Sequence, residues 1–104
     1  MSVDSLKEQY FPKYITSGKD GFYKFLLICQ IKKLVLINKG SYKGISPDLE
    51  YLDHHDRFLV LYRREGEEQY LDMAKIFRKV AHKIHRIMLK KNMTIQNNKF
   101  LNLV

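Results

Sequence analysis

The sequence contains few of the residues that cross-link or interrupt small domains. Its 104 residues include one cysteine (Cys29), two prolines, five glycines and no tryptophan. A single cysteine cannot form an intramolecular disulfide, so nothing points to an oxidising compartment. Neither phosphate-binding glycine pattern, Gly-x-x-x-x-Gly-Lys or Gly-x-Gly-x-x-Gly, is present, which argues against a nucleotide-dependent enzyme. We therefore expect an intracellular protein, cytoplasmic or nuclear, that needs no cofactor.

Long apolar runs are also missing. The most apolar stretch, from Phe22 to Ile37, is interrupted by three lysines. A membrane-spanning helix needs about 20 predominantly apolar residues, so this stretch is too short and too charged. The first nine residues include Asp4 and Glu8 and have no apolar centre of the kind found in signal peptides. The sequence thus predicts no transmembrane segment.

Acidic residues are absent from the last third of the chain. Residues 1–72 contain eleven basic and eleven acidic residues, whereas residues 73–104 contain eight basic residues and no acid. The net charge of +8 is therefore concentrated in one segment. Such a segment favours an acidic partner, whether nucleic acid, a membrane surface or an acidic protein. A solvated helix face that keeps the protein soluble would give the same pattern.

The clearest pattern runs from Glu67 to Lys91, where apolar residues recur three or four positions apart. This spacing predicts an α-helix of about six turns with one apolar face. Acids gather at its start and lysines at its end, in the order that the helix dipole favours. We predict a long basic helix here.

The two faces of this predicted helix suggest two kinds of contact. Its basic face could follow a phosphate backbone or an acidic protein, without reading a base sequence. It consists of Lys75, Arg78, Lys79, His82, Lys83, His85, Arg86, Lys90 and Lys91. Its apolar stripe has the spacing of helix pairing and could contact a partner helix. The residues for that contact are Tyr70, Met73, Phe77, Ile84, Ile87 and Met88.

Three further patterns precede this helix. Residues 2–15 are predicted to be helical, with a break near Phe11 because Pro12 removes a hydrogen bond. A loop is expected at 16–21. The sequence Ser46-Pro47-Asp48 predicts a second helix start, followed by about two turns. The poor helix formers Asp53-His54-His55-Asp56 are expected to end that helix.

Two short apolar runs decide the predicted fold class. Leu34–Ile37 and Phe58–Tyr62 are each flanked by polar residues, which suits interior strands, although periodicity does not separate strand from buried helix. We predict a single α+β domain over residues 1–92. Amphipathic helices would pack on a small antiparallel sheet formed by 34–38 and 57–63, and 93–104 would form a flexible tail. The alternative is an all-α helical bundle.

Three groups of residues could carry chemistry, and each has a simpler structural interpretation. Asp53-His54-His55-Asp56 has ligand types that suit zinc, but four consecutive residues cannot converge on one ion, and a polar turn is the preferred interpretation. His82 and His85 share a helix face, with no carboxylate within a turn to orient either ring. Cys29 lies among aliphatic residues, as a core cysteine does. We therefore predict no catalytic, cofactor or metal site.

These patterns indicate a non-enzymatic protein–protein interaction module, a subunit or adaptor of a larger complex. Its partner would be another protein or a second copy of the chain. The alternative is a nucleic-acid-binding module that contacts phosphates through the basic C-terminal helix. No zinc-finger, single-strand RNA or basic-zipper signature supports that alternative.

Overall fold

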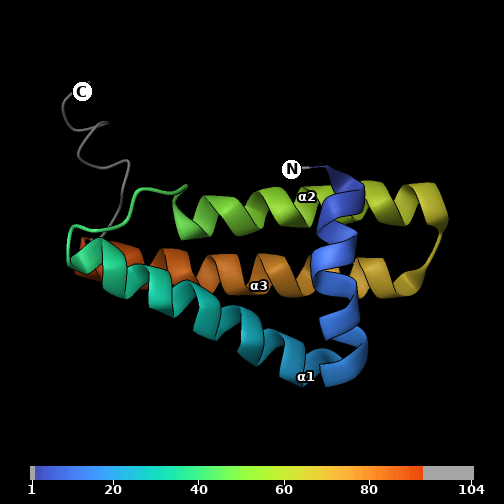
Figure 1. Ribbon diagram of the computed structural model, residues 1–104, viewed down its shortest axis with the longest axis horizontal. Coiled ribbons are helices and arrows are strands. Elements are labelled where there is room, and N and C mark those ends of the chain that lie inside the picture. The colour runs from blue at the N-terminus through green and yellow to red at the C-terminus, as the bar shows by residue number, and fades with distance from the viewer. Residues whose placement is uncertain (1, 93–104) are drawn as a thin grey trace.

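The computed structural model describes residues 2–92, and within this range the chain forms three α-helices and no strand. Helix α1 spans Val3–Asn38, α2 spans Pro47–Glu65 and α3 spans Glu68–Lys91. Helices α2 and α3 form an antiparallel hairpin, and α1 packs against both (Figure 1). The predicted α+β fold is therefore wrong, and the all-α bundle is confirmed. The tail predicted at 93–104 lies outside the described residues.

Both segments assigned to a sheet are helical, residues 34–38 within α1 and residues 57–63 within α2. Each continues a helical spacing of buried residues that starts earlier in the chain. On α1 this spacing joins Leu26, Gln30 and Leu34, and on α2 it leads to Phe58 and Leu61. The apolar runs looked like strands because their outward positions are also aliphatic. A buried interior strand would hide both faces, whereas these helices leave one apolar side exposed.

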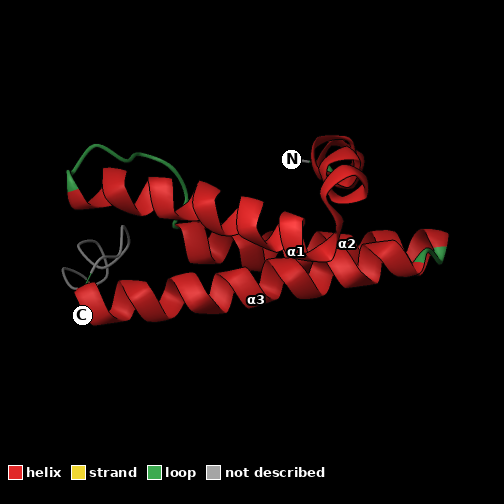
Figure 2. Ribbon diagram, turned by 90° about the horizontal axis from the view of Figure 1, so that it is seen from below, coloured by secondary structure: helices red, strands yellow, loops and turns green. Residues whose placement is uncertain are grey.

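Helix α1 breaks at Gly18 and not at Pro12. The hydroxyl of Thr16 donates a hydrogen bond to the carbonyl oxygen of Pro12 (2.7 Å), and the helix continues through both residues. Gly18 has φ 71° and ψ −178°, a combination open almost only to glycine. The first half of α1 therefore runs at a steep angle to the second half and lies across the hairpin (Figure 2). A straight helix of 36 residues would be about 54 Å long, beyond the molecule's longest dimension of 43 Å.

Helix α2 begins where the sequence predicts and ends much later. Pro47 occupies its first position after the N-cap Ser46. The expected end at 53–56 is wrong, because that segment lies inside the helix. Its side chains fit there: Asp53 forms an ion pair with Arg57 one turn later (2.8 Å), and His54 faces the core. The helix ends at Gly66, whose left-handed conformation lets its N–H bond to the helix's last turn.

The core is a cluster of rings centred on Phe77 of α3, which is fully buried. Its neighbours come from α1 and α2, with ring centroids 5.0 to 5.6 Å away. They are Tyr10, Phe22, Tyr51, His54 and Phe58. Most of these pairs meet edge to face, the geometry that aromatic quadrupoles favour. Both halves of α1 contribute a ring, so this cluster fixes the bend at Gly18.

Candidate interaction surface

The basic face predicted on α3 is fully exposed: all nine of its side chains lie at the surface. Within residues 2–92, none of its seven lysines and arginines forms an ion pair with a carboxylate. Lys79 instead lies over the ring of Tyr23 on α1, 4.9 Å from its centroid. This helix therefore presents positive charge that the described part of the chain leaves uncompensated.

The apolar residues predicted for a partner helix are mostly used inside the chain. Tyr70, Met73, Phe77, Ile84 and Met88 belong to the core. Another protein could reach them only if α1 or α2 moved away. Ile87 is the exception among the six, because it is half-buried and borders a groove.

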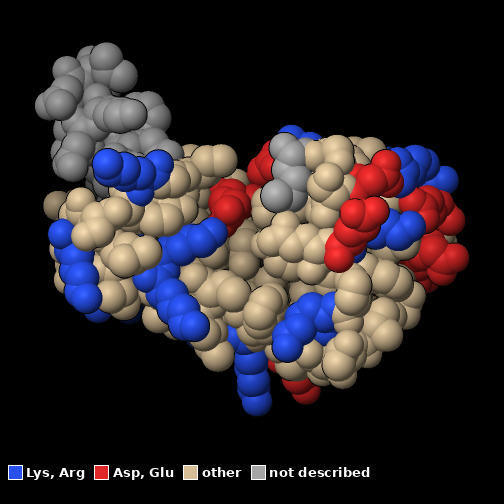
Figure 3. Space-filling view, viewed as in Figure 1, with Lys and Arg blue, Asp and Glu red and all other residues tan. Residues whose placement is uncertain are grey.

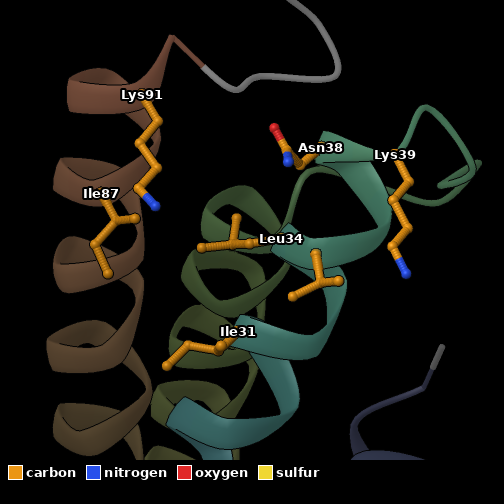
Figure 4. A pocket seen from close by; sticks show the side chains of 7 residues that line it. Ile31, Leu34, Asn38, Lys39, Ile87 and Lys91 are labelled. Atoms are coloured by element: carbon orange, nitrogen blue, oxygen red, sulfur yellow. The ribbon is translucent and has the colours of Figure 1, made fainter.

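That groove lies between the C-terminal halves of α1 and α3 and encloses about 340 Å³. From α1, Ile31 and Leu34 point toward α3; from α3, Ile87 and Lys91 point toward α1 (Figure 4). Its lining residues are Ile31, Leu34, Val35, Asn38, Lys39, Ile87 and Lys91. The floor is thus aliphatic, and the polar groups lie at its border.

Helix α1 extends the apolar surface beyond the groove. Ile28, Ile31 and Val35 are 54%, 42% and 48% exposed, at spacings of three and four residues. Residues at these spacings share one face of a helix, so they form a continuous stripe. Sequence reasoning missed this stripe because it assigned residues 34–38 to a buried strand and so did not continue the helix through Val35. We call these three residues, together with Leu34 and Ile87, the apolar strip.

The residues of the apolar strip belong to two segments of the sequence that contain no acid. Residues 21–47 carry five lysines and no Asp or Glu, and residues 73–92 carry seven lysines or arginines and no Asp or Glu. Within residues 2–92, Lys33 is the only lysine of the first segment paired with a carboxylate, that of Glu50 (2.5 Å). On the face shown in Figure 3, red side chains gather mainly over the right half, away from the groove. The acid-free stretch 21–47 was the sequence signal that could have revealed this surface.

A second hollow, of about 290 Å³, follows the same seam between α1 and α3. Five of its seven lining residues are charged, and two of them, Lys19 and Asp72, form an ion pair (3.5 Å). Lys75 and Lys79 of the basic face also line it. The α1 residues that line the two hollows run from Lys19 to Asn38, about 29 Å of helix. The seam is apolar at one end and is lined by three lysines and two aspartates at the other.

His85 is held by a carboxylate that the sequence did not place near it. Asp48, at the start of α2, lies 2.8 Å from its Nδ1 atom. Burial alone would raise the pKa of Asp48, but hydrogen bonds from Ser46, His85 and the Leu49 amide outweigh it and lower the pKa. The hydroxyl of Ser46 bonds to the carboxylate of Asp48 and not to the imidazole, so the three groups do not form a Ser-His-Asp relay. This cluster joins α2 to α3.

The remaining candidate groups do not assemble into a site. His54 packs in the core while His55 pairs with Asp56 (2.9 Å), so the two imidazoles of this motif do not meet. Across residues 2–92, no cluster of three or more His, Cys, Asp or Glu side chains could hold a metal ion. His82 is exposed, 3.4 Å from the Nε atom of Arg78. Cys29 is partly exposed on α1.

Comparisons with known proteins identify no relative of this chain. The chain matches no family model, and no curated protein or solved structure is significantly similar to it. None of the three helices in the described range is long and apolar enough to cross a membrane.

Proposed function

We propose that this chain is a non-enzymatic interaction module, an intracellular subunit or adaptor that binds another protein. The observation that carries the proposal is the apolar strip. Three of its aliphatic side chains are about half exposed, side by side along α1. Single exposed apolar residues are ordinary, whereas a continuous patch beside a groove is typical of a binding surface.

The arrangement of the polar groups supports binding over catalysis. His85 and Asp48 are residue types that can form an acid–base dyad. However, Ser46 donates its hydrogen bond to the Asp48 carboxylate and not to the His85 imidazole, so the imidazole cannot activate this hydroxyl. Gln30 and Lys33 use their polar atoms to hold the start of α2: Gln30 donates to the carbonyl of Pro47 (2.8 Å) and Lys33 pairs with Glu50. These contacts hold α1 and α2 in a fixed relative position, and a binding surface built on α1 needs such a rigid support.

Site-specific photo-crosslinking in the native cells tests this function. A photoreactive amino acid at position 31 should form a covalent adduct with one defined protein, identified by mass spectrometry. The matched control places the same group at position 60, because Val60 is equally exposed, at 46%, on α2. The identified protein, once purified, should bind the chain and lose binding to a Val35→Glu variant. The absence of a specific adduct at position 31, or binding unaffected by Val35→Glu, would refute the proposal.

Nucleic-acid binding through the basic face is the second candidate. The observation that favours it is the set of seven exposed lysines and arginines on α3 without carboxylate partners in the described range. If they contact phosphates, affinity should fall steeply with salt. The triple variant Arg78→Glu, Lys79→Glu, Arg86→Glu should then abolish binding and leave the fold intact. Negligible binding of the unmodified chain to duplex or single strands near physiological salt would exclude this candidate.

A further inference from the structure

The groove and the apolar strip combine properties that a single chemical class of partner satisfies. The floor is aliphatic, from Ile31, Leu34 and Ile87. The border is cationic, with Lys39 on one side and Lys91 on the other. Neither lysine pairs with a carboxylate of the described residues. A partner that covers the floor must bring apolar groups, and one that satisfies the border must bring negative charge.

The concave shape narrows the choice further. A flat bilayer would touch the edges of the seam without filling the hollow between the two helices. A nucleic acid would place its phosphates on the lysines but would leave the aliphatic floor unused. A convex amphipathic helix fills a groove with its apolar residues and keeps charged flanks at the edges, a recurrent mode of protein recognition.

The length of the seam matches such a helix. The α1 residues that line the seam run from Lys19 to Asn38, about 29 Å of helix, and residues 23, 27 and 31 lie on one face. The aliphatic end lies beside Ile87, and Lys75 and Lys79 border the other end. A helix of about five turns could therefore place leucine-like side chains in the groove and acidic side chains on the lysines together.

We propose that the α1–α3 groove binds an amphipathic α-helix of a partner protein, with an aliphatic stripe and acidic flanks. The stripe rests on the apolar strip, and the glutamates or aspartates face the lysines of residues 21–47 and 73–92. This assignment rests on the proposed function and adds to it the chemical class and the location of the partner.

Synthetic helices test the partner class directly on the full chain. The probe is a fluorescent peptide of about 18 residues, with leucine at positions i, i+3, i+4 and i+7 and glutamate on both flanks. One control replaces each glutamate with lysine, and another replaces each leucine with serine. Fluorescence anisotropy should show saturable binding of the acidic leucine peptide, and at least about tenfold weaker binding of each control. Equal binding of the lysine peptide would overturn the assignment.

Variants of the protein test the location. Ile31→Glu should weaken peptide binding by about tenfold or more without lowering the melting temperature, since Ile31 is 42% exposed. Its matched control is Val60→Glu on α2, which should bind as the unmodified chain does. The pair Lys39→Glu and Lys91→Glu should weaken binding of the acidic peptide and also reduce its salt dependence. Binding that Ile31→Glu leaves intact would place the peptide elsewhere and overturn the proposal.

Other occupants of the groove give different outcomes, and each would overturn this assignment. Binding to phosphatidylserine vesicles that Ile31→Glu abolishes, with no binding of the acidic peptide, would identify a membrane surface. A dimer in analytical ultracentrifugation that Ile31→Glu dissociates would identify a second copy of this chain. If the acidic peptide does not bind while a defined protein still crosslinks at position 31, the proposed function stands and only the partner class is wrong.

Discussion

The two halves of α3 have different surroundings. Around Phe77 the helix is enclosed by rings from α2 and from both halves of α1. Around Ile87 it borders an open groove, and apolar side chains of α1 remain exposed beside it. The part of α3 around Phe77 thus stabilises the fold, whereas the part around Ile87 lies beside exposed apolar surface. A bundle held by an aromatic cluster at one end can leave aliphatic surface uncovered at the other end.

The largest expected effect comes from the enclosed half. Phe77→Ala removes the ring that five other rings contact and leaves a cavity. It should lower the free energy of unfolding by about 3–5 kcal/mol, measured by urea denaturation followed by circular dichroism. A loss below about 1 kcal/mol would show that this cluster does not hold the fold, and the contrast between the two halves would disappear.

Gly18→Ala should come next, because the bend at Gly18 allows both halves of α1 to reach Phe77. A methyl group there would meet no atom within 4 Å, so the cost arises from the backbone conformation alone. Strain of that kind costs about 1–3 kcal/mol, again measured by denaturation. Lys24→Ala, at an exposed position of the same helix, is the control and should change stability by less than about 0.5 kcal/mol. Equal stabilities of the two variants would contradict the strained bend.

The pH dependence of stability tests the buried histidine of the cluster. Burial lowers the pKa of His54 from its ordinary value of 6.5. Asp53 lies 3.8 Å from its Nδ1 atom, too far for a hydrogen bond. The unfolded chain therefore takes up a proton at higher pH than the folded chain. The stabilisation from a neutral His54 is present above pH 6.5 and is lost as the pH falls below 6.5.

Urea denaturation between about pH 7.5 and pH 5.5 measures this effect. The unmodified chain should lose stability across that range. His54→Phe keeps a ring in the cluster and cannot titrate, so its stability should change less with pH. The same pH slope in both proteins would mean that His54 does not account for the loss.

The smallest change in stability belongs to the open half. Val35→Ala should alter the free energy of unfolding by no more than about 0.5 kcal/mol, because Val35 is half exposed. Leu34→Ala, at the adjacent buried position, is the matched comparison and should cost about 2–5 kcal/mol. The two values come from the same denaturation experiment. A large loss for Val35→Ala would show that the apolar strip stabilises the fold and is not free to bind.

The sequence predicted one side of this contrast better than the other. The apolar spacing of α3 was sufficient to identify its buried face, Phe77 and Ile84 included, because a single helix with strong periodicity needs no tertiary information. The predicted α2 ended too early, at 53–56, because helix propensities alone do not include the burial of His54 in the core. Tertiary packing overrode propensity there, as rings from α1 and α3 surround that imidazole.

The apolar strip could not be predicted from the sequence, for a different reason. A run such as Leu34–Ile37 does not reveal which of its residues a neighbouring helix covers. Leu34 is buried and Val35 is not, and the packing of α1 against the other two helices decides between them. The same holds for His85, whose partner Asp48 is 37 positions away in sequence. Contacts between distant helices depend on topology, which the periodicity of one segment does not contain.

The order of the helices along the chain also affects how the protein is made. Only Gly66 and Glu67 separate α2 from α3, so these helices can pair at little cost in loop-closure entropy. Helix α1 is synthesised first, yet Phe22 packs on Phe77, which leaves the ribosome 55 residues later. Until then the apolar side of α1 lacks the ring of α3 that completes its aromatic cluster. Translation is therefore the stage at which this small helical protein is most open to aggregation and to chaperones.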